Sequence, residues 1–255
     1  MLFDTHAHFD DERFDEDRYE TIEKVHESGV EYIVNAASDM DSSETGIALA
    51  ERYDFIYAAV GVHPHNAEEM DEAKIEKIKK LAQHRKVVAI GEIGLDYYYD
   101  TAPRDVQKHW FARQIQLARE LGLPIIIHDR DAHEDTLKIV TSENARDVGG
   151  VFHCYAGSVE MAREVLDNNF YISLGGVVTF KNAKKAVEVV KFAPLDRLLI
   201  ETDSPYLTPE PYRGKRNDSG YVRLVAEKIA EIKGIPFEEV ARITLENGKK
   251  LFRIN

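Results

Sequence analysis

The sequence is poor in cysteine and has no long apolar run. Cys154 is the single cysteine in 255 residues, so the chain cannot form an internal disulfide and fits a reducing compartment. The longest apolar runs, such as LPIIIH at 123–128, are far too short to span a bilayer. The chain does not open with the basic and then apolar segments of a signal peptide. These absences predict a cytoplasmic protein that does not enter a membrane.

A surplus of positive charge is also missing. The chain has 33 Lys and Arg residues against 46 Asp and Glu residues, a formal net charge of −13. A broad basic face of the kind that holds nucleic acid is therefore not expected. A polyanionic substrate would need bound metal ions or a confined basic loop.

The glycine-rich fingerprint of dinucleotide-binding folds is absent as well. THAHFDDERF occupies the place where that loop would follow the first predicted strand. What the sequence does contain is a series of short apolar or β-branched runs, as expected of buried parallel strands. The eight predicted strands begin near Met1, Val30, Phe55, Lys86, Leu123, Gly149, Phe170 and Arg197.

Helical patterns alternate with these runs. The spacing of apolar residues supports these helices. One of them is also marked by Pro103 at its start and by Gly122 at its end. Eight β–α units in about 250 residues are typical of a (β/α)8 barrel, so we predict an α/β fold of the TIM-barrel type. Residues 1–255 are expected to form one domain, and an open doubly wound sheet is the alternative. The helices are expected at 17–28, 71–84, 103–122, 132–143, 159–168, 183–192, 221–233 and 236–252.

Polar residues fall at the carboxyl ends of the predicted strands, where barrels of this type carry their chemistry. The opening FDTHAHFD places His6 and His8 on one face of a strand, because side chains alternate. A chance pair at a strand end is the alternative for this pattern alone. The other strand ends supply His63, Glu92, His128, His153 and Asp203. Four further histidines lie in helical patterns and are expected to be surface or packing residues: His26, His84, His109 and His133.

Four of the strand-end histidines and two carboxylates are too many ligands for one tetrahedral zinc ion and suit two divalent metals. These six residues are His6, His8, His128, His153, Glu92 and Asp203. Glu92 comes from the middle of the strand order and is the natural bridging carboxylate. The first and eighth strands are neighbours in a closed barrel. The fifth and sixth strands are also neighbours, at another part of the barrel. Two sets of ligands are therefore expected, His6 with His8 and Asp203, and His128 with His153.

The chain resembles the TatD-like metal-dependent deoxyribonucleases, within the amidohydrolase-like barrel group. The matching stretches are DTHAHFD, GVHPH, AIGEIGLDYY, LPIIIHDRDA, FHCYAGS, GGVVTFKNAKK, LLIETDSPYLTP, YRGKRND and LENGKKLF. Tyr155-Ala156 departs from the usual residues, and RNDSG lacks the Glu-Pro that often follows this Asn. The resemblance implies a metal-dependent phosphodiesterase that degrades DNA from the 3′ end. It carries the metal role to His6, His8, Glu92, His128, His153 and Asp203.

Two metals would make hydroxide available near neutral pH and would neutralise phosphate oxygens. Mg²⁺ is the expected ion, and Zn²⁺ or Mn²⁺ would also fit. Asp203 is the candidate that orients the water and takes its proton. His63 has no assigned place beside either metal. It could contact a phosphate or protonate the leaving oxygen, and a structural loop histidine is the alternative.

Three further groups are candidates for contact with DNA. Arg130 could bind a phosphate or pair with a carboxylate. The Tyr97–Tyr99 run could stack on a base or pack against the barrel rim. A basic loop in an otherwise acidic chain is expected to hold phosphates, and a solvated loop is the alternative. The residues of this basic loop are Arg213, Lys215 and Arg216.

Two other functions remain open at this stage. The first is an amidohydrolase or esterase that cuts a cyclic amide, a lactone or an aminoacyl ester. Many such sites bridge their metals with a carboxylated lysine, whereas the fourth predicted strand offers Glu92. The second is a non-catalytic metal-binding protein, which would not need Asp203. No obligate protein partner is evident.

Overall fold

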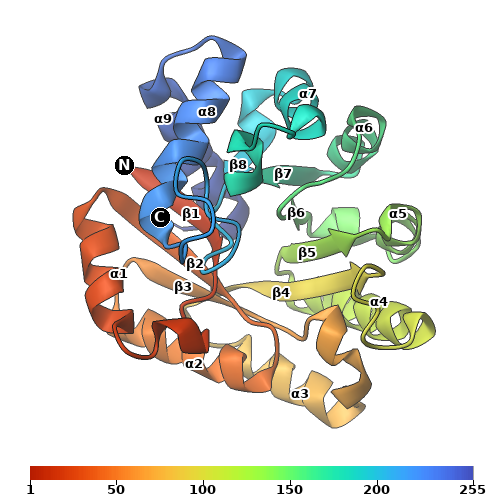
Figure 1. The fold of residues 1–255 in the computed structure, drawn as a ribbon. Coiled ribbons are helices and arrows are strands. Elements are labelled where there is room, and N and C mark those ends of the chain that lie inside the picture. Colours follow the sequence, from red (N-terminus) through yellow and green to blue (C-terminus); the bar gives the residue numbers. More distant parts are fainter. Residues whose placement is uncertain (255) are drawn as a thin grey trace. The chain divides into compact units, whose positions relative to one another are not determined.

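Eight strands alternate with helices along residues 1–254, which the computed structural model describes (Figure 1). The strands follow one another in the sheet in chain order, and the pairs with a defined register are parallel. The fold is the predicted (β/α)8 TIM barrel. The strands are β1 (Leu2–Ala7), β2 (Val30–Ala36), β3 (Ile56–Val60), β4 (Val87–Asp96), β5 (Ile125–Arg130), β6 (Gly150–Phe152), β7 (Phe170–Leu174) and β8 (Leu198–Ile200).

All eight predicted helices are present, with ends that differ from the predictions by at most three residues. In residues 1–254 no helix is both long enough and apolar enough to cross a bilayer. The α-helices are α1 (Arg18–Glu27), α2 (Met40–Arg52), α3 (Glu72–Leu81), α4 (Arg104–Leu121), α5 (His133–Ser142), α6 (Val159–Asp167), α7 (Lys184–Phe192), α8 (Val222–Lys233) and α9 (Phe237–Phe252).

Helix α2 was not predicted from the sequence. Its residues, MDSSETGIALAER, include many small and polar side chains, so the apolar pattern is weak. The helix starts through a capping box, in which Asp39 Oδ1 accepts the Ser42 N–H at 2.8 Å. The Ser42 hydroxyl in turn lies 2.8 Å from the Asp39 backbone N–H. Local side-chain bonds, rather than apolar periodicity, define where this helix begins.

The chain clusters into two compact units, each made of separate segments. The first unit comprises Met1–Asn35, Cys154–Arg163 and Ile172 to the end of the described chain. The second comprises Ala36–His153 and Glu164–Tyr171. That all residues form one domain stays a prediction.

In the first unit, β8 lies beside β1. Ala7 pairs with Ser204 just beyond β8, and the Asp203 N–H donates to the His6 carbonyl at 2.9 Å. Helices α8 and α9 lie side by side (Figure 1), and α9 packs against β1. Gly248 allows this approach, because a Cβ there would collide with the Phe3 ring. The first and last strands are thus neighbours, as the prediction of a closed barrel required.

In the second unit, β3, β4, β5 and β6 are consecutive, and α4 packs on β4. All ten residues of β4 are buried. Gly94 lies in this strand with φ +149°, and a Cβ there would collide with the backbone carbonyl of His128 in β5. Glycine is therefore required where the ends of β4 and β5 come together.

Candidate metal centre

The first unit brings His6, His8 and Asp203 together. The Nε2 atoms of the two imidazoles lie 3.1 Å apart, and Asp203 Oδ1 lies 3.7 Å from His6 and 3.4 Å from His8. His6 is fully buried, and the Asp203 side chain is 15% exposed. Two imidazole nitrogens and one carboxylate oxygen therefore converge, in a group that could hold a metal ion.

Buried hydrogen bonds made by neighbouring residues hold this cluster in place. Asp4 accepts the Thr202 N–H at 2.9 Å and the Thr202 hydroxyl at 2.5 Å. Burial raises the pKa of Asp4 to about 7, and these hydrogen bonds oppose that rise. Asn217 donates to the carbonyls of Thr202 and Tyr206 at 2.9 and 2.6 Å, which fixes the turn that carries Asp203. Asp4 and Asn217 thus position the cluster without belonging to it.

The second unit gathers imidazoles around one carboxylate oxygen. Glu92 Oε1 lies 2.6 Å from His128 Nδ1, 2.8 Å from His153 Nε2 and 3.4 Å from His63 Nε2. Glu92 is 3% exposed, so its carboxylate is removed from bulk water. The position of His63 differs from the prediction, which gave this residue no place beside a metal. The loop between β3 and α3 brings it within reach of Glu92.

Long-range backbone contacts place His63. The His63 N–H donates to the Ser38 carbonyl at 2.9 Å. The preceding residue, Val62, exchanges two hydrogen bonds with the Gln114 side chain of α4, at 2.8 and 3.0 Å. Burial lowers the pKa of His63 to about 4, and the Glu92 carboxylate offsets only part of this effect. The imidazole is therefore neutral near pH 7, as a metal ligand must be.

Asp96 is a residue of this site that the sequence analysis missed. Its Oδ2 atom lies 3.0 Å from His128 Nε2 and 2.9 Å from His65 Nε2. Its Oδ1 atom accepts the backbone N–H groups of Tyr98 and Tyr99, both at 2.9 Å. Burial alone would raise the pKa of Asp96, but these hydrogen bonds hold it well below its usual value. Asp96 is thus an ionised, fully buried acceptor.

The contact with Asp96 decides which nitrogen of His128 carries the proton. An ionised carboxylate only accepts hydrogen bonds, so His128 Nε2 must donate to it. The other ring nitrogen, Nδ1, lies 2.6 Å from Glu92 Oε1 and donates to this carboxylate while the imidazole is protonated. Loss of the Nδ1 proton would leave the lone pair that a metal ligand needs. Burial lowers the pKa of His128, but its hydrogen bonds to Asp96 and Glu92 outweigh this and raise it overall. Carboxylates commonly orient metal-binding histidines in this way.

We expect Asp96→Asn to weaken metal binding and activity roughly 10- to 100-fold, as changes of this kind do elsewhere. The amide oxygen can still accept the two tyrosine N–H groups. The amide nitrogen, however, donates toward His128 Nε2 and shifts the imidazole proton to Nδ1. Calorimetric titration of the folded variant with Mn²⁺ would check this. Native affinity in a folded variant would show that Asp96 only holds the loop.

The donor sets fit divalent metals. Three imidazoles and the Glu92 carboxylate form one cluster, and two imidazoles and one carboxylate form the other. Neutral imidazole and carboxylate oxygen are the ligands expected for Zn²⁺, Mn²⁺ and related ions. The assignment of His6, His8, Glu92, His128, His153 and Asp203 as ligands stays a prediction, and the sequence did not predict a ligand role for His63.

Arg130 stacks on aromatic rings. Its guanidinium carbon lies 4.2 Å from the ring centroid of Tyr98 and 4.9 Å from that of Tyr99. Among residues 1–254 no carboxylate pairs with this guanidinium. Tyr97 points elsewhere, because its hydroxyl donates to Asp135 of α5 at 2.7 Å. The tyrosine run therefore divides into one packed and two exposed side chains.

The basic loop is exposed, and one of its residues is engaged within the chain. Arg216 makes a two-point contact with Asp17, at 2.6 and 2.8 Å, and also lies over the Phe14 ring. The guanidinium of Arg213 lies 4.3 Å from the centroid of the Phe180 ring. Arg213 and Lys215 thus remain the better placed of the three to receive a phosphate.

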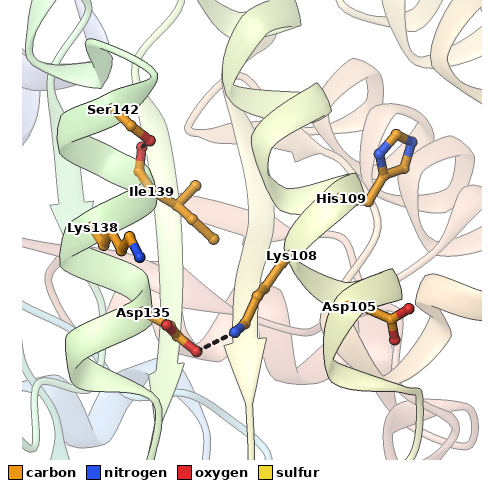
Figure 2. Close-up of a pocket in the computed structure, with 7 residues that line it drawn as sticks. All are labelled: Asp105, Lys108, His109, Asp135, Lys138, Ile139 and Ser142. Atoms are coloured by element: carbon orange, nitrogen blue, oxygen red, sulfur yellow. Dashed lines mark hydrogen bonds and ion pairs between the residues drawn. The ribbon is translucent and has the colours of Figure 1, made fainter.

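A hollow of about 420 Å³ lies between α4 and α5 and contains none of the predicted site residues. Figure 2 shows the Lys108–Asp135 ion pair, 2.5 Å long, reaching across it. His109 lines the same hollow. His26 and His133 contact residues four positions away, the Val30 carbonyl and Asp129 respectively. His84, which lies just beyond the end of α3, contacts Glu51.

A (β/α)8 fold with histidine and carboxylate clusters at its strand ends is the architecture of metal-dependent hydrolases. The model of one family, TatD related DNase, matches residues 3–253. The chain therefore belongs to the TatD family, as its motifs predicted.

Similar proteins match along their whole length. The chain is 56% identical over 255 residues to the uncharacterized metal-dependent hydrolase YabD of Bacillus subtilis (strain 168), with 100% of both chains covered. It is 41% identical over 258 residues to the uncharacterized metal-dependent hydrolase YcfH of Escherichia coli (strain K12), with 100% and 97% covered. A crystal structure of YjjV, a TatD homologue from Escherichia coli K12, superposes with a TM-score of 0.93 at 31% identity and covers 100% of this chain and 98% of that one.

Proposed function

We propose that the protein is a hydrolase that cleaves phosphodiester bonds of DNA and removes nucleotides from the 3′ end. The observation that carries this proposal is the convergence of three imidazoles on the buried Glu92 carboxylate. The cluster of His6, His8 and Asp203 supports it. That both clusters serve one reaction centre is part of the proposal, as the prediction of a two-metal site requires.

Each part of the site has a distinct task in this proposal. Two divalent ions would be held, with Mg²⁺ the expected pair and Zn²⁺ or Mn²⁺ also compatible. Their ligands would be His6, His8, Glu92, His128, His153 and Asp203, and His63 is a further candidate because it lies 3.4 Å from Glu92. When bound, these ions lower the pKa of water and neutralise phosphate oxygens. Asp203 is partly exposed, so its carboxylate can orient a water molecule and accept its proton.

A panel of substrates tests the proposal. The purified protein is incubated with Mg²⁺, Mn²⁺ or Zn²⁺ and a 5′-labelled single-stranded oligodeoxynucleotide, a cyclic amide or an aryl ester. We expect a ladder of products shortened stepwise from the 3′ end, and EDTA should abolish it. Turnover of the amide or ester without cleavage of DNA would contradict the phosphodiesterase assignment. The absence of a lysine from β4 favours the phosphoester over a site bridged by a carboxylated lysine.

The basic loop should act in binding rather than in the chemical step. Replacing Arg213 and Lys215 with Ala should raise KM for DNA several-fold and leave kcat little changed. The salt dependence of binding should weaken by about 0.7 in log–log slope for each lost contact with a single strand. Arg223→Ala is the control, because this exposed arginine of α8 already pairs with Glu227. Unchanged KM with a collapsed kcat would place the loop in the chemistry instead.

A further inference from the structure

Arg130 differs from two other arginines that stack on tyrosine rings, Arg13 and Arg104. Arg13 lies over Tyr206 and pairs with Asp11 at 3.0 Å. Arg104 lies over Tyr97 and pairs with Asp100 at 3.1 Å. Arg130 lies over Tyr98 and Tyr99, and no carboxylate within residues 1–254 neutralises it. Its charge and hydrogen-bonding edge are therefore available to an external anion.

The two rings beside Arg130 are held in place but left open to solvent. Tyr98 is 59% exposed and Tyr99 is 56% exposed, although the guanidinium covers part of both. Their rings meet edge to face, with centroids 5.0 Å apart and planes at 89°. A second edge-to-face contact joins Tyr99 to His65 at 5.2 Å. Large rings fixed on the surface in this way lose little entropy when they bind a flat partner.

Strand pairing and hydrogen bonds hold the backbone beneath these side chains. Asp96 is the cross-strand partner of Arg130 where β4 pairs with β5, and the Tyr97 N–H donates to the Arg130 carbonyl at 2.9 Å. The Asp96 carboxylate accepts the amides of Tyr98 and Tyr99 and also contacts His128. One buried side chain thus joins this surface to the Glu92 cluster.

We propose that Tyr98, Tyr99 and Arg130 form a nucleotide subsite beside the Glu92 cluster. The guanidinium holds a phosphate, and an exposed tyrosine ring stacks on the adjoining base. Planar guanidinium groups suit phosphate oxygens, and aromatic rings bind bases without regard to sequence. This inference rests on the proposed action on DNA and adds the residues that recognise the strand.

Binding and cleavage are measured separately to test the subsite. Fluorescence anisotropy with EDTA present compares a labelled oligothymidylate with an abasic strand of the same length. We expect the native protein to prefer the strand that carries bases. Tyr98→Ala/Tyr99→Ala should lower affinity for oligothymidylate about 5- to 150-fold, the range for loss of base stacking, and leave the abasic strand little changed. Tyr98→Phe/Tyr99→Phe should keep native affinity, because the rings remain.

Arg130→Gln should weaken binding of both strands and lower the salt slope by about 0.7. Tyr97→Phe and Arg104→Gln are matched controls, since these neighbours point toward Asp135 and Asp100, and should bind as the native protein does. Equal affinities of native protein and alanine variant for oligothymidylate would overturn the subsite. Cleavage of DNA with native KM by Tyr98→Ala/Tyr99→Ala would also overturn the subsite, but it would leave the phosphodiesterase assignment intact. Failure of the native protein to bind or cleave DNA would overturn both.

Discussion

Asp203→Asn is expected to lower kcat by about two to four orders of magnitude, the usual range for loss of a general base. Asn keeps the size of the side chain and one oxygen but loses the charge and the basicity. The backbone should tolerate it, because Asp203 has φ 55° and Asn adopts this left-handed region as readily as Asp. The Glu92 cluster is untouched, whereas the ion held by His6 and His8 loses its anionic ligand.

Metal content and single-turnover cleavage, measured together at saturating Mn²⁺, separate the two roles of Asp203. Excess metal should restore occupancy but not rate. Asp218→Asn is a control from the same region, because this carboxylate caps a short 3₁₀ helix through the Gly220 N–H at 2.8 Å. Full recovery of the rate at high Mn²⁺ would mean that Asp203 is only a ligand.

Glu92→Gln is expected to weaken metal binding strongly. Glu92 Oε1 is the atom on which His63, His128 and His153 converge. The amide nitrogen of Gln donates rather than accepts, and its amide oxygen carries no charge to balance a cation. We expect metal affinity and kcat to fall by more than the roughly 10- to 100-fold that outer contacts contribute.

Metal content after dialysis against equimolar Mn²⁺ measures this effect, with two ions expected for the native chain and at most one for Glu92→Gln. The substitution keeps the shape of the side chain in a fully buried strand, so circular dichroism should confirm native secondary structure. Two ions retained with native affinity by the folded variant would contradict the central position of Glu92.

Strands were predictable because burial on both faces leaves a continuous apolar run. Even β6 and β8, three residues each, were found from GVF and LLI. Helix α2 was not, since its start depends on the Asp39–Ser42 capping box and its sequence has little apolar periodicity. The apolar pattern of a sequence therefore predicts the elements whose apolar residues are buried. It misses elements that begin through local polar contacts.

The same distinction applies to the site. His6 and His8 were predictable as a pair from strand alternation, and the structure brings them within 3.1 Å. Asp96 could have been found by that rule, since positions 92, 94 and 96 share a face of β4. His63 was predicted as a strand-end residue, but its contact with Glu92 could not be, because its place depends on Val62 binding Gln114, 52 residues away in the chain. The ion pair between Arg216 and Asp17 is likewise a tertiary contact that no sequence pattern indicates.

The central claim is that two metal ions share one centre built from both clusters. Anomalous diffraction from crystals grown with Mn²⁺ tests it most directly. We predict two anomalous peaks roughly 3.5–4 Å apart, the spacing of other two-metal sites, with Glu92 in contact with both. One peak should lie against His6, His8 and Asp203, and the other against His128 and His153. A single peak, or two peaks that share no ligand, would contradict the account.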